Sequence, residues 1–339
     1  LSLGRKIGYG LGDTACNLSF QMTMLYLLFF YTDVFGITPA AAGVIFIIAR
    51  VLDALSNPVM GYIMDHTKSK HGNALVYLRY GALPFAAAIV PMFLAPELGP
   101  AGKFAWALLT YILWNALYTM VNIPYSSLTS QLTDDPQERT SLSSIRMICA
   151  IVAIIFVSMA TGPLSSAFGD RRTGFLAAAA LYGLITFVIL RICYRSVRDV
   201  VSTENRKADG YELKDLFHVL GANSPALLVA GIFFLASSAI YSIETSIVFY
   251  ATYNMRNPGI VPAFMGCVVF AMIVGNLLVP AISKALDKKG AFYAGAALSS
   301  AACITMQFMP YNQTILILIC ATLSGLGSSV AGTMGWAML

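Results

Sequence analysis

The stretch GVIFIIARVL at Gly43–Leu52 decides the class of fold to which this chain belongs. It is almost uninterruptedly apolar, and the apolar run around it extends over about residues 38–64. A run of that length crosses the hydrocarbon core of a bilayer as an α-helix, because every backbone group then pairs within its own segment. A transmembrane β-barrel needs short segments of alternating polarity, so this stretch excludes one.

The composition of the whole chain also indicates a membrane protein. Of its 339 residues, 58% are hydrophobic and only 11% are charged, whereas a soluble domain carries about 25% charged residues. So few charges cannot cover a water-soluble surface, which excludes a soluble enzyme, a nucleic-acid-binding module and a disordered regulator. Six cysteines are scattered through apolar segments without paired spacing, and we interpret them as buried hydrophobic side chains.

Apolar runs of spanning length follow one another along the chain, so we predict an all-α polytopic bundle with about ten visible transmembrane helices. The predicted spans are about 9–35, 38–64, 75–95, 103–126, 143–165, 173–193, 224–253, 261–284, 290–310 and 313–339. Fourteen lysines and arginines fall in the connections on one side of these spans and four on the other. The positive-inside rule therefore predicts a cytoplasmic N-terminus in a plasma membrane, which in a bacterium is the inner membrane.

An internal repeat divides the predicted bundle. Gly36–Pro39 reads GITP and Gly259–Pro262 reads GIVP, 223 residues apart, and each precedes the second helix of its half. One helix later, Asp65 and Asp287 begin polar turns that are 222 residues apart. The two marks agree to one residue and predict two pseudo-symmetric six-helix halves in parallel orientation.

The repeat also sets the expected domain boundaries. We predict an N-terminal six-helix bundle over 1–193, a cytoplasmic middle loop over 194–222 and a C-terminal bundle over 223–339. A second half as long as the first would end near residue 446, so the chain is expected to show helices 7–10 and to lack helices 11 and 12.

Several polar side chains lie inside the predicted spans, where a charge costs about 2.5–3.5 kcal/mol on insertion scales. Each therefore needs a structural or functional reason. Pairs four residues apart share one helix face, and three such pairs predict a polar cleft in the first half, with Arg146 as counter-charge. The pairs are Asp13 with Asn17, Asp53 with Asn57, and Tyr118 with Asn122.

Helix-to-helix hydrogen bonding is the competing explanation for these polar groups, at about 0.6 kcal/mol for each bond. We favour a functional role for Asp53, which Arg50 three residues earlier could instead neutralise. For Asp13 and for Glu244, in the seventh predicted span, the structural and functional interpretations are evenly balanced. Trp114 and Tyr118 could offer aromatic faces to a sugar ring, or they could pack between helices.

Enzymatic motifs are absent from the sequence. It contains no metalloprotease HExxH, no GxSxG nucleophile elbow and no Walker A loop, and its three histidines fall in predicted loops. The sequence therefore predicts neither an enzyme nor an ATP-driven pump, and no cofactor.

Four stretches together make the chain recognisable by family. They are KIGYGLGD at Lys6–Asp13, LYLLFFYTDVFGI at Leu25–Ile37, ARVLDALSNPVMGYIMDHTKSKHG at Ala49–Gly72 and TYILWNALYTMVNIPYSSL at Thr110–Leu128. They strongly resemble the glycoside–pentoside–hexuronide:cation symporters, the melibiose-permease-like branch of the major facilitator superfamily. The resemblance covers essentially the whole chain. It implies twelve helices, alternating access, and uptake of a sugar or glycoside coupled to a monovalent cation by a monomer in the bilayer.

The resemblance also implies roles for individual residues. Cation coupling is assigned to Asp53, Asn57 and Thr119, which form a possible Na⁺ site. Asp65 and the basic turn with Lys68 and Lys70 match the cytoplasmic gate motif. Sugar recognition is assigned to a larger set, namely Asn17, Trp114, Tyr118, Asn122, Ser126 and Arg146.

One departure from the family leaves the mechanism open. The family usually shows a second aspartate where this chain has Asn57, and an amide can ligate Na⁺ but cannot carry a proton. Three hypotheses therefore remain: a cation symporter, which we favour, an uncoupled sugar facilitator, and a non-transporting membrane receptor. Neither the sugar nor the coupling ion follows from the sequence.

Overall fold

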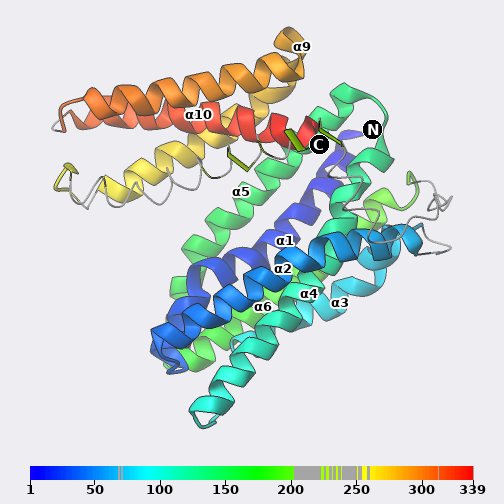
Figure 1. The fold of residues 1–339 in the computed structure, drawn as a ribbon, viewed down its shortest axis with the longest axis vertical. Coiled ribbons are helices and arrows are strands. Elements are labelled where there is room, and N and C mark those ends of the chain that lie inside the picture. The colour runs from blue at the N-terminus through cyan, green and yellow to red at the C-terminus, as the bar shows by residue number, and fades with distance from the viewer. Residues whose placement is uncertain are drawn as a thin grey trace. The chain divides into compact units, whose positions relative to one another are not determined.

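The computed structural model describes residues 1–201 except 68, 70 and 71, and residues 260–338 except 312; between them it describes 223, 224, 227, 228, 231, 234, 235, 238, 250 and 254–257. The elements whose full bounds the structure describes are α-helices and the π-helical segment η1 (Figure 1). The elements are α1 Leu3–Phe29, η1 Phe30–Val34, α2 Pro39–His66, α3 Leu75–Met92, α4 Pro100–Leu132, α5 Pro136–Ser166, α6 Arg171–Val197, α9 Val261–Phe308 and α10 Thr314–Met338.

The prediction of an all-helical membrane protein is confirmed. Seven of the described helices, all except α1, are long and apolar enough to cross a bilayer. Helix α1 fills the first predicted span, but Asp13, Asn17 and Gln21 along it lower its mean hydropathy. The chain is a multi-pass membrane protein.

The predicted number of ten spans is not matched, because the described residues form eight α-helices. The eighth and ninth predicted spans, 261–284 and 290–310, are joined in the single element α9. This element kinks at Asp287, whose φ of 61° and ψ of 179° lie outside the helical region. The predicted seventh span, 224–253, falls mostly outside the described residues, and so does most of the predicted middle loop.

Local sequence signals place several helix ends. Thr38 caps the start of α2, where its side chain accepts a hydrogen bond from the Ala41 amide and Pro39 takes the first helical position. Asp170 caps α6 by accepting from the Thr173 amide. Gly36 lies between η1 and α2 at a φ of 77°, a left-handed conformation that glycine adopts without strain.

The described chain divides into two compact units. The first comprises Leu1–Asp134 and Cys149–Leu213, and the second comprises Asp135–Ile148 and Lys214–Leu339. Helix α5 therefore contributes its first part to the second unit and its remainder to the first. The predicted domain boundaries, with a middle loop over 194–222, stay a prediction.

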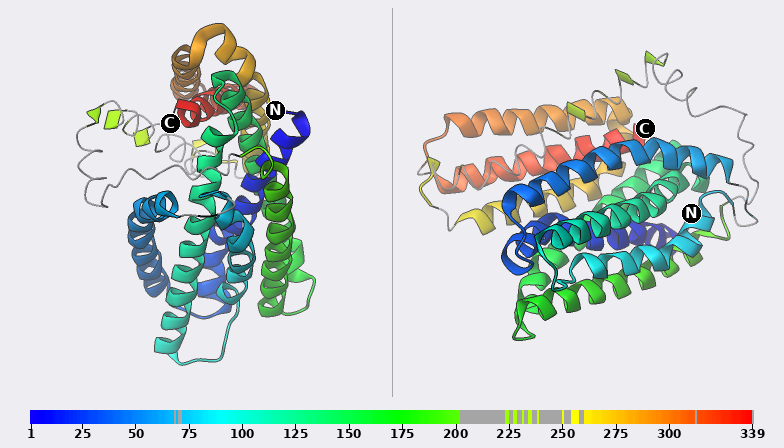
Figure 2. Two further views of the ribbon diagram at one scale, coloured as in Figure 1. Left: turned by 90° about the vertical axis from the view of Figure 1, so that its right-hand side faces the viewer. Right: turned by 60° about the horizontal axis from the view of Figure 1, so that its bottom comes forward.

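In the first unit, α1 and α3 pack against α6, while α2 and α3 pack against α4 (Figure 2). The core between these helices is rich in aromatic rings. The ring centroids of Phe30, Phe93 and Phe175 lie 5.2–6.1 Å from one another. Glycines allow the closest approaches. A Cβ on Gly183 of α6 would lie 2.4 Å from the Ala86 carbonyl oxygen of α3.

In the second unit, α9 and α10 pack closely along their length (Figure 1). Small residues line this contact, and a Cβ on Gly295 would lie 2.8 Å from the carbonyl oxygen of Gly327. Asn276 of α9 accepts a short hydrogen bond from Thr333 of α10, and both residues are buried. Close backbone approach with polar cross-links is the usual packing of membrane helices.

Candidate functional site

Asp53 of α2 carries a carboxylate that two side chains of α4 hold from one side. Asn115 Nδ2 donates to Asp53 Oδ1 at 3.2 Å, and Thr119 Oγ1 donates to the same oxygen at 3.4 Å. Asn115 and Thr119 are four residues apart on α4, so they present their donors from one face. The predicted meeting of Asp53 with Thr119 is present in the structure.

Asn115 is a member of this group that the sequence analysis did not select. Its signal is its position one helical turn before Thr119, on the same face of α4. The predicted polar pair on this helix, Tyr118 with Asn122, lies on the neighbouring face of α4 and does not include Asn115.

The second oxygen of Asp53 faces the guanidinium group of Arg50 at a long separation. Asp53 Oδ2 lies 4.0 Å from Arg50 Nη1, and the two side chains are 26% and 52% exposed. Arg50 also donates through Nη2 to the sulfur of Met24. This separation is at the outer limit for an ion pair and is too long for a hydrogen bond. The carboxylate is therefore anchored at Oδ1 and only loosely paired at Oδ2.

Asn57 does not join this group. It lies one turn beyond Asp53 on α2, is exposed, and makes no side-chain hydrogen bond within the described part of the chain. The expected three-residue cation site is thus represented by Asp53 and Thr119, with Asn115 where Asn57 was predicted. Among the described residues no group of three or more His, Cys, Asp and Glu could hold a metal ion.

A second polar cluster links α1 to α4. Asp13 is buried, and its Oδ2 accepts a hydrogen bond from the Tyr125 hydroxyl at 3.1 Å. A Cβ on Gly12 would lie 2.3 Å from the Tyr125 ring, so only glycine admits the ring there. Asn17 donates through Nδ2 to the backbone carbonyl of Asp13 at 2.9 Å. Asn17 and Asp13 are thus in contact, but the Asn17 amide bonds the backbone of Asp13 and not its carboxylate.

Aromatic side chains form a column beside these polar residues. Tyr118 stacks on Trp114 and Phe20, with centroid separations of 5.4 and 5.5 Å. Trp114 is only 1% exposed, and its indole N–H donates to Ser19 at 2.6 Å. The Trp114 ring is thus enclosed by protein, whereas Tyr118 is half-buried at the edge of the column.

The remaining predicted sugar-binding residues are less concentrated. Asn122 and Ser126 are half-buried on α4, and Asn122 makes no side-chain hydrogen bond within the described ranges. Arg146 is buried and belongs to the second unit, in the first part of α5. Its predicted pairing with Asn122 or Asp13 stays a prediction.

Of the predicted gate residues, Asp65 is among the described residues and lies in the last turn of α2. Asp65 is exposed, and its backbone carbonyl accepts from Asn73 Nδ2 at 3.5 Å. Lys68 and Lys70 lie outside the described residues, as does Glu244 of the predicted seventh span.

The chain matches a known protein family along nearly its whole length. Residues 8–339 match the model of the MFS/sugar transport protein family, where MFS stands for the major facilitator superfamily. The chain belongs to this family. Its members are transporters and not enzymes. Because relatives of the chain include a putative glycoside/cation symporter, the resemblance to the melibiose-permease-like symporters is confirmed.

Curated members of the sugar transport family resemble the chain along most of its length. It is 33% identical to the "Uncharacterized symporter YnaJ" of Bacillus subtilis, covering 100% of this chain and 74% of that protein. It is 34% identical to the "Putative glycoside/cation symporter YagG" of Escherichia coli, covering 86% and 64%. It is 33% identical to the "Isoprimeverose transporter" of Lactiplantibacillus pentosus, covering 87% and 62%. The chain thus spans less than two thirds of the last two proteins.

Solved structures share the fold of this family member at low sequence identity. A bacterial homologue of the iron transporter ferroportin, in an outward-facing state, matches with a TM-score of 0.76 and 14% identity, over 100% of this chain and 84% of that one. The transporter FucP, in its outward conformation, matches with a TM-score of 0.68 and 13% identity, over 99% and 87%. These likenesses show the major facilitator fold alone.

Proposed function

We propose that the chain carries a sugar or glycoside across the membrane together with a monovalent cation, Na⁺ or H⁺, by alternating access. Relatives described as a putative glycoside/cation symporter and as an isoprimeverose transporter support this class of substrate. The transport would use two six-helix halves, with bundles over 1–193 and 223–339 joined by a middle loop over 194–222.

The observation that carries the proposal is the state of the Asp53 carboxylate. Asn115 and Thr119 fix Oδ1, while Oδ2 is only 4.0 Å from Arg50 and partly open. A carboxylate within a membrane span is costly unless it serves a purpose. Here one oxygen is oriented by protein donors and the other has capacity for an ion. Asp53 Oδ2 and the hydroxyl oxygen of Thr119 would supply two ligands to Na⁺, or Asp53 would bind the proton.

The sugar would bind beside this carboxylate, in contact with the half-buried edge of Tyr118. Asn17 and Asn122 would supply amide groups, and Ser126 would supply a hydroxyl group. Trp114 would act as the support on which Tyr118 stacks, since its own ring is enclosed. Aromatic faces and fixed polar groups together suit the alternating apolar and hydroxyl-bearing surfaces of a pyranose ring.

The distribution of basic residues and the turn after α2 suggest how the transporter is oriented in the membrane. The N-terminus would be cytoplasmic, as the excess of Lys and Arg on that side indicates, and the transporter would act as a monomer in a bacterial inner membrane. Asp65, with Lys68 and Lys70, would form the cytoplasmic gate.

An uncoupled sugar facilitator is the second candidate. Asn57 favours it, because its amide stands where the family usually has a second aspartate and Asp53 is then the one carboxylate at the proposed ion site. The Asn57 side chain is also exposed and makes no hydrogen bond among the described residues. Binding of one monovalent cation would neutralise that single charge, and coupling would rest on Asp53 alone.

Sugar uptake into proteoliposomes separates the candidates. The full-length transporter is reconstituted, and entry of a panel of labelled glycosides is followed with and without an inward Na⁺ or H⁺ gradient. A symporter accumulates the sugar only with a gradient, a facilitator equilibrates it regardless, and a receptor binds it without counterflow.

The variant Asp53→Asn then tests the site. It keeps the shape of the side chain and removes its charge, so accumulation driven by the ion gradient should fall at least tenfold while sugar exchange persists. Asp199→Asn is the matched control, because Asp199 also neighbours an arginine at 3.3 Å but is 65% exposed. Undiminished gradient-driven accumulation in Asp53→Asn would overturn the proposed coupling site.

A further inference from the structure

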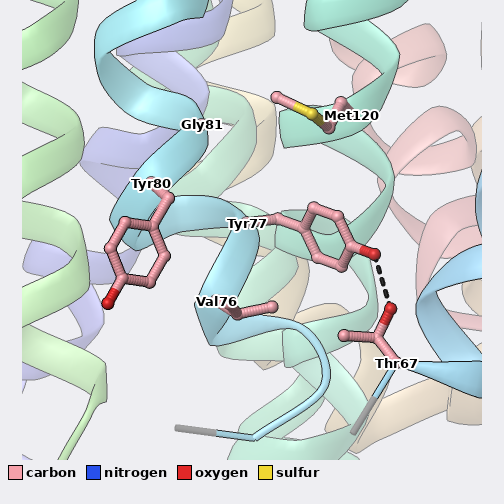
Figure 3. Close-up of a pocket in the computed structure, with 6 residues that line it drawn as sticks. All are labelled: Thr67, Val76, Tyr77, Tyr80, Gly81 and Met120. Carbon is pink, nitrogen blue, oxygen red and sulfur yellow. Dashed lines mark hydrogen bonds between the residues drawn. The ribbon is translucent and has the colours of Figure 1, made fainter. Parts of the chain in front are cut away.

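A pocket of about 280 Å³ lies in the first unit, apart from the polar residues described above. The end of α2, the first two turns of α3 and the middle of α4 line it (Figure 3). Its lining is Thr67, Val76, Tyr77, Tyr80, Gly81 and Met120. Apolar atoms dominate this lining, and no acidic side chain contributes to it.

The pocket has hydroxyl groups at its edge and an apolar interior. Tyr77 and Thr67 share a hydrogen bond of 2.6 Å across one side, as Figure 3 shows. The Tyr80 side chain is 61% exposed. Gly81 brings no side chain to the pocket, and a Cβ there would lie 3.0 Å from the ends of Met120 and Val121. Tyrosines with an apolar ring and a polar tip are typical of the boundary between headgroups and acyl chains.

An apolar stripe leads from the pocket along α3. Tyr80, Leu83, Pro84 and Ala87 are all exposed, and their spacing of three and four residues places them on one face of the helix. Because α3 is one of the spanning helices, this face is available to the bilayer. The stripe is long enough for the upper part of an acyl chain to lie against it.

Two arginines give the neighbourhood of the pocket a positive charge. The guanidinium carbon of Arg79 lies 5.3 Å from the centroid of the Tyr80 ring. Arg191 of α6 donates to the backbone carbonyl of Arg79 at 3.3 Å, which brings a second guanidinium group to the same part of α3. Each basic side chain near an anionic membrane surface raises the binding constant about fivefold.

We propose that this pocket binds an anionic glycerophospholipid. One acyl chain lies along the stripe from Tyr80 to Ala87, the glycerol region occupies the pocket beside Val76 and Tyr77, and the phosphate faces Arg79. The positive charge selects an anionic lipid over a zwitterionic one, and the apolar stripe selects a lipid over a soluble anion. The site depends only on the chain lying in a membrane, so it stands independently of the proposed sugar transport.

Lipid retention by the purified full-length protein tests the site. The protein is delipidated in detergent and incubated with phosphatidylglycerol or phosphatidylcholine of the same acyl composition, and native mass spectrometry counts the lipids that remain. We expect retention of phosphatidylglycerol at least fivefold above phosphatidylcholine. Equal retention of the two would overturn the selection for charge.

Two variants separate the pocket from the charge. Val76→Trp fills the pocket and should abolish the tightly retained lipid, while Leu113→Trp on the exposed face of α4 should not. Arg79→Gln should reduce the preference for phosphatidylglycerol about fivefold, while Arg198→Gln, at an exposed arginine paired with Asp199, should leave it unchanged. A Val76→Trp protein that folds and retains the lipid as the parent does contradicts the proposal.

Photo-crosslinking keeps the test decisive if Val76→Trp does not fold. A photoreactive phenylalanine analogue in place of Tyr80 should label phosphatidylglycerol strongly, and excess unlabelled phosphatidylglycerol should compete. The same analogue at Leu109, an exposed position on α4, should give only weak labelling without competition. Equal, non-competed labelling at the two positions would show ordinary bilayer contact and no site.

Discussion

Tyr9 of α1 and Tyr125 of α4 each donate a hydroxyl hydrogen bond to the backbone carbonyl of the other, at 3.1 Å and 2.8 Å. Their rings lie 4.9 Å apart and both residues are fully buried. The Tyr125 hydroxyl has one proton, and it shares this proton between the Tyr9 carbonyl and the carboxylate of Asp13, whose Oδ2 lies 3.1 Å away. The two tyrosines therefore fasten α1 to α4 beside a buried charge, directly after Pro124.

The variant Tyr125→Phe should destabilise the first unit while keeping its packing. It removes the one hydroxyl proton that the Tyr9 carbonyl and the Asp13 carboxylate share, and the loss of a hydrogen bond to a charged group costs about 1.5–3 kcal/mol. Thermal unfolding in detergent should show a clear decrease in melting temperature. Tyr31→Phe is the control, because its hydroxyl donates to one neutral carbonyl, that of Ala107; a decrease as large as that of Tyr125→Phe would contradict the role of Asp13.

The two donors to Asp53 should act together. Thr119→Val and Asn115→Leu each remove one hydrogen bond to Oδ1, and each should weaken the dependence of sugar uptake on the cation by about threefold to tenfold, as expected for about 1 kcal/mol. The double variant should lose more than the sum of the two free energies, since each remaining donor partly compensates for the other's removal. Sugar affinity is measured across a Na⁺ series and a pH series for the parent, the two single variants and the double variant, which together form a double-mutant cycle. Strict additivity would show that the donors orient Asp53 independently.

Removal of the charge of Arg50 should strengthen cation binding. The guanidinium group is 4.0 Å from Asp53 Oδ2 and competes electrostatically with any ion there. For charges about 6 Å apart at an effective dielectric constant of 20 to 80, the repulsion is about 1–3 kcal/mol. Arg50→Gln should therefore lower the half-saturating cation concentration at least threefold, and Arg50→Lys should not. A higher half-saturating concentration in Arg50→Gln would mean that the arginine holds the carboxylate in place for the ion.

Closely packed glycines should tolerate substitution according to the space around them. Gly183→Ala would place a Cβ 2.4 Å from the Ala86 carbonyl oxygen, so α3 and α6 must separate and the protein should lose about 1–3 kcal/mol of stability. Gly61→Ala on α2 meets nothing within 4 Å and should be neutral or slightly stabilising. Melting temperatures of the two variants in one detergent provide the comparison. Equal changes would mean that the α3–α6 contact relaxes freely.

Replacement of Asn57, which stands where the family usually has a second aspartate, is a direct test of coupling. Asn57→Asp would add a second carboxylate one turn from Asp53 on α2 and should strengthen the dependence of sugar affinity on Na⁺ or H⁺. By linkage, the sugar must then tighten ion binding by the same factor. Sugar and ion titrations of the parent and the variant check both sides. Strong coupling in the parent that Asn57→Asp leaves unchanged would show that Asp53 alone suffices.

The amino-acid sequence by itself determined the membrane setting, the helical class and the family of this protein. Runs such as Gly43–Leu52 leave the backbone no other way to pair its polar groups in hydrocarbon. The cost of a charge in the span likewise pointed to Asp53, and the family resemblance pointed to Thr119. These conclusions depend on local periodicity and on the solvent, which a sequence displays directly.

The partners of the polar groups were decided only by the tertiary structure. Whether Asp53 meets Asn57 on its own helix or Asn115 on α4 depends on how α2 rotates and slides against α4, and no local pattern specifies that rotation. The same holds for Trp114, which periodicity could not distinguish from an exposed sugar platform until α1 brought Ser19 to its indole nitrogen. Contacts between helices depend on the fit of whole faces, such as Gly12 against Tyr125, and they exist only once the helices have packed.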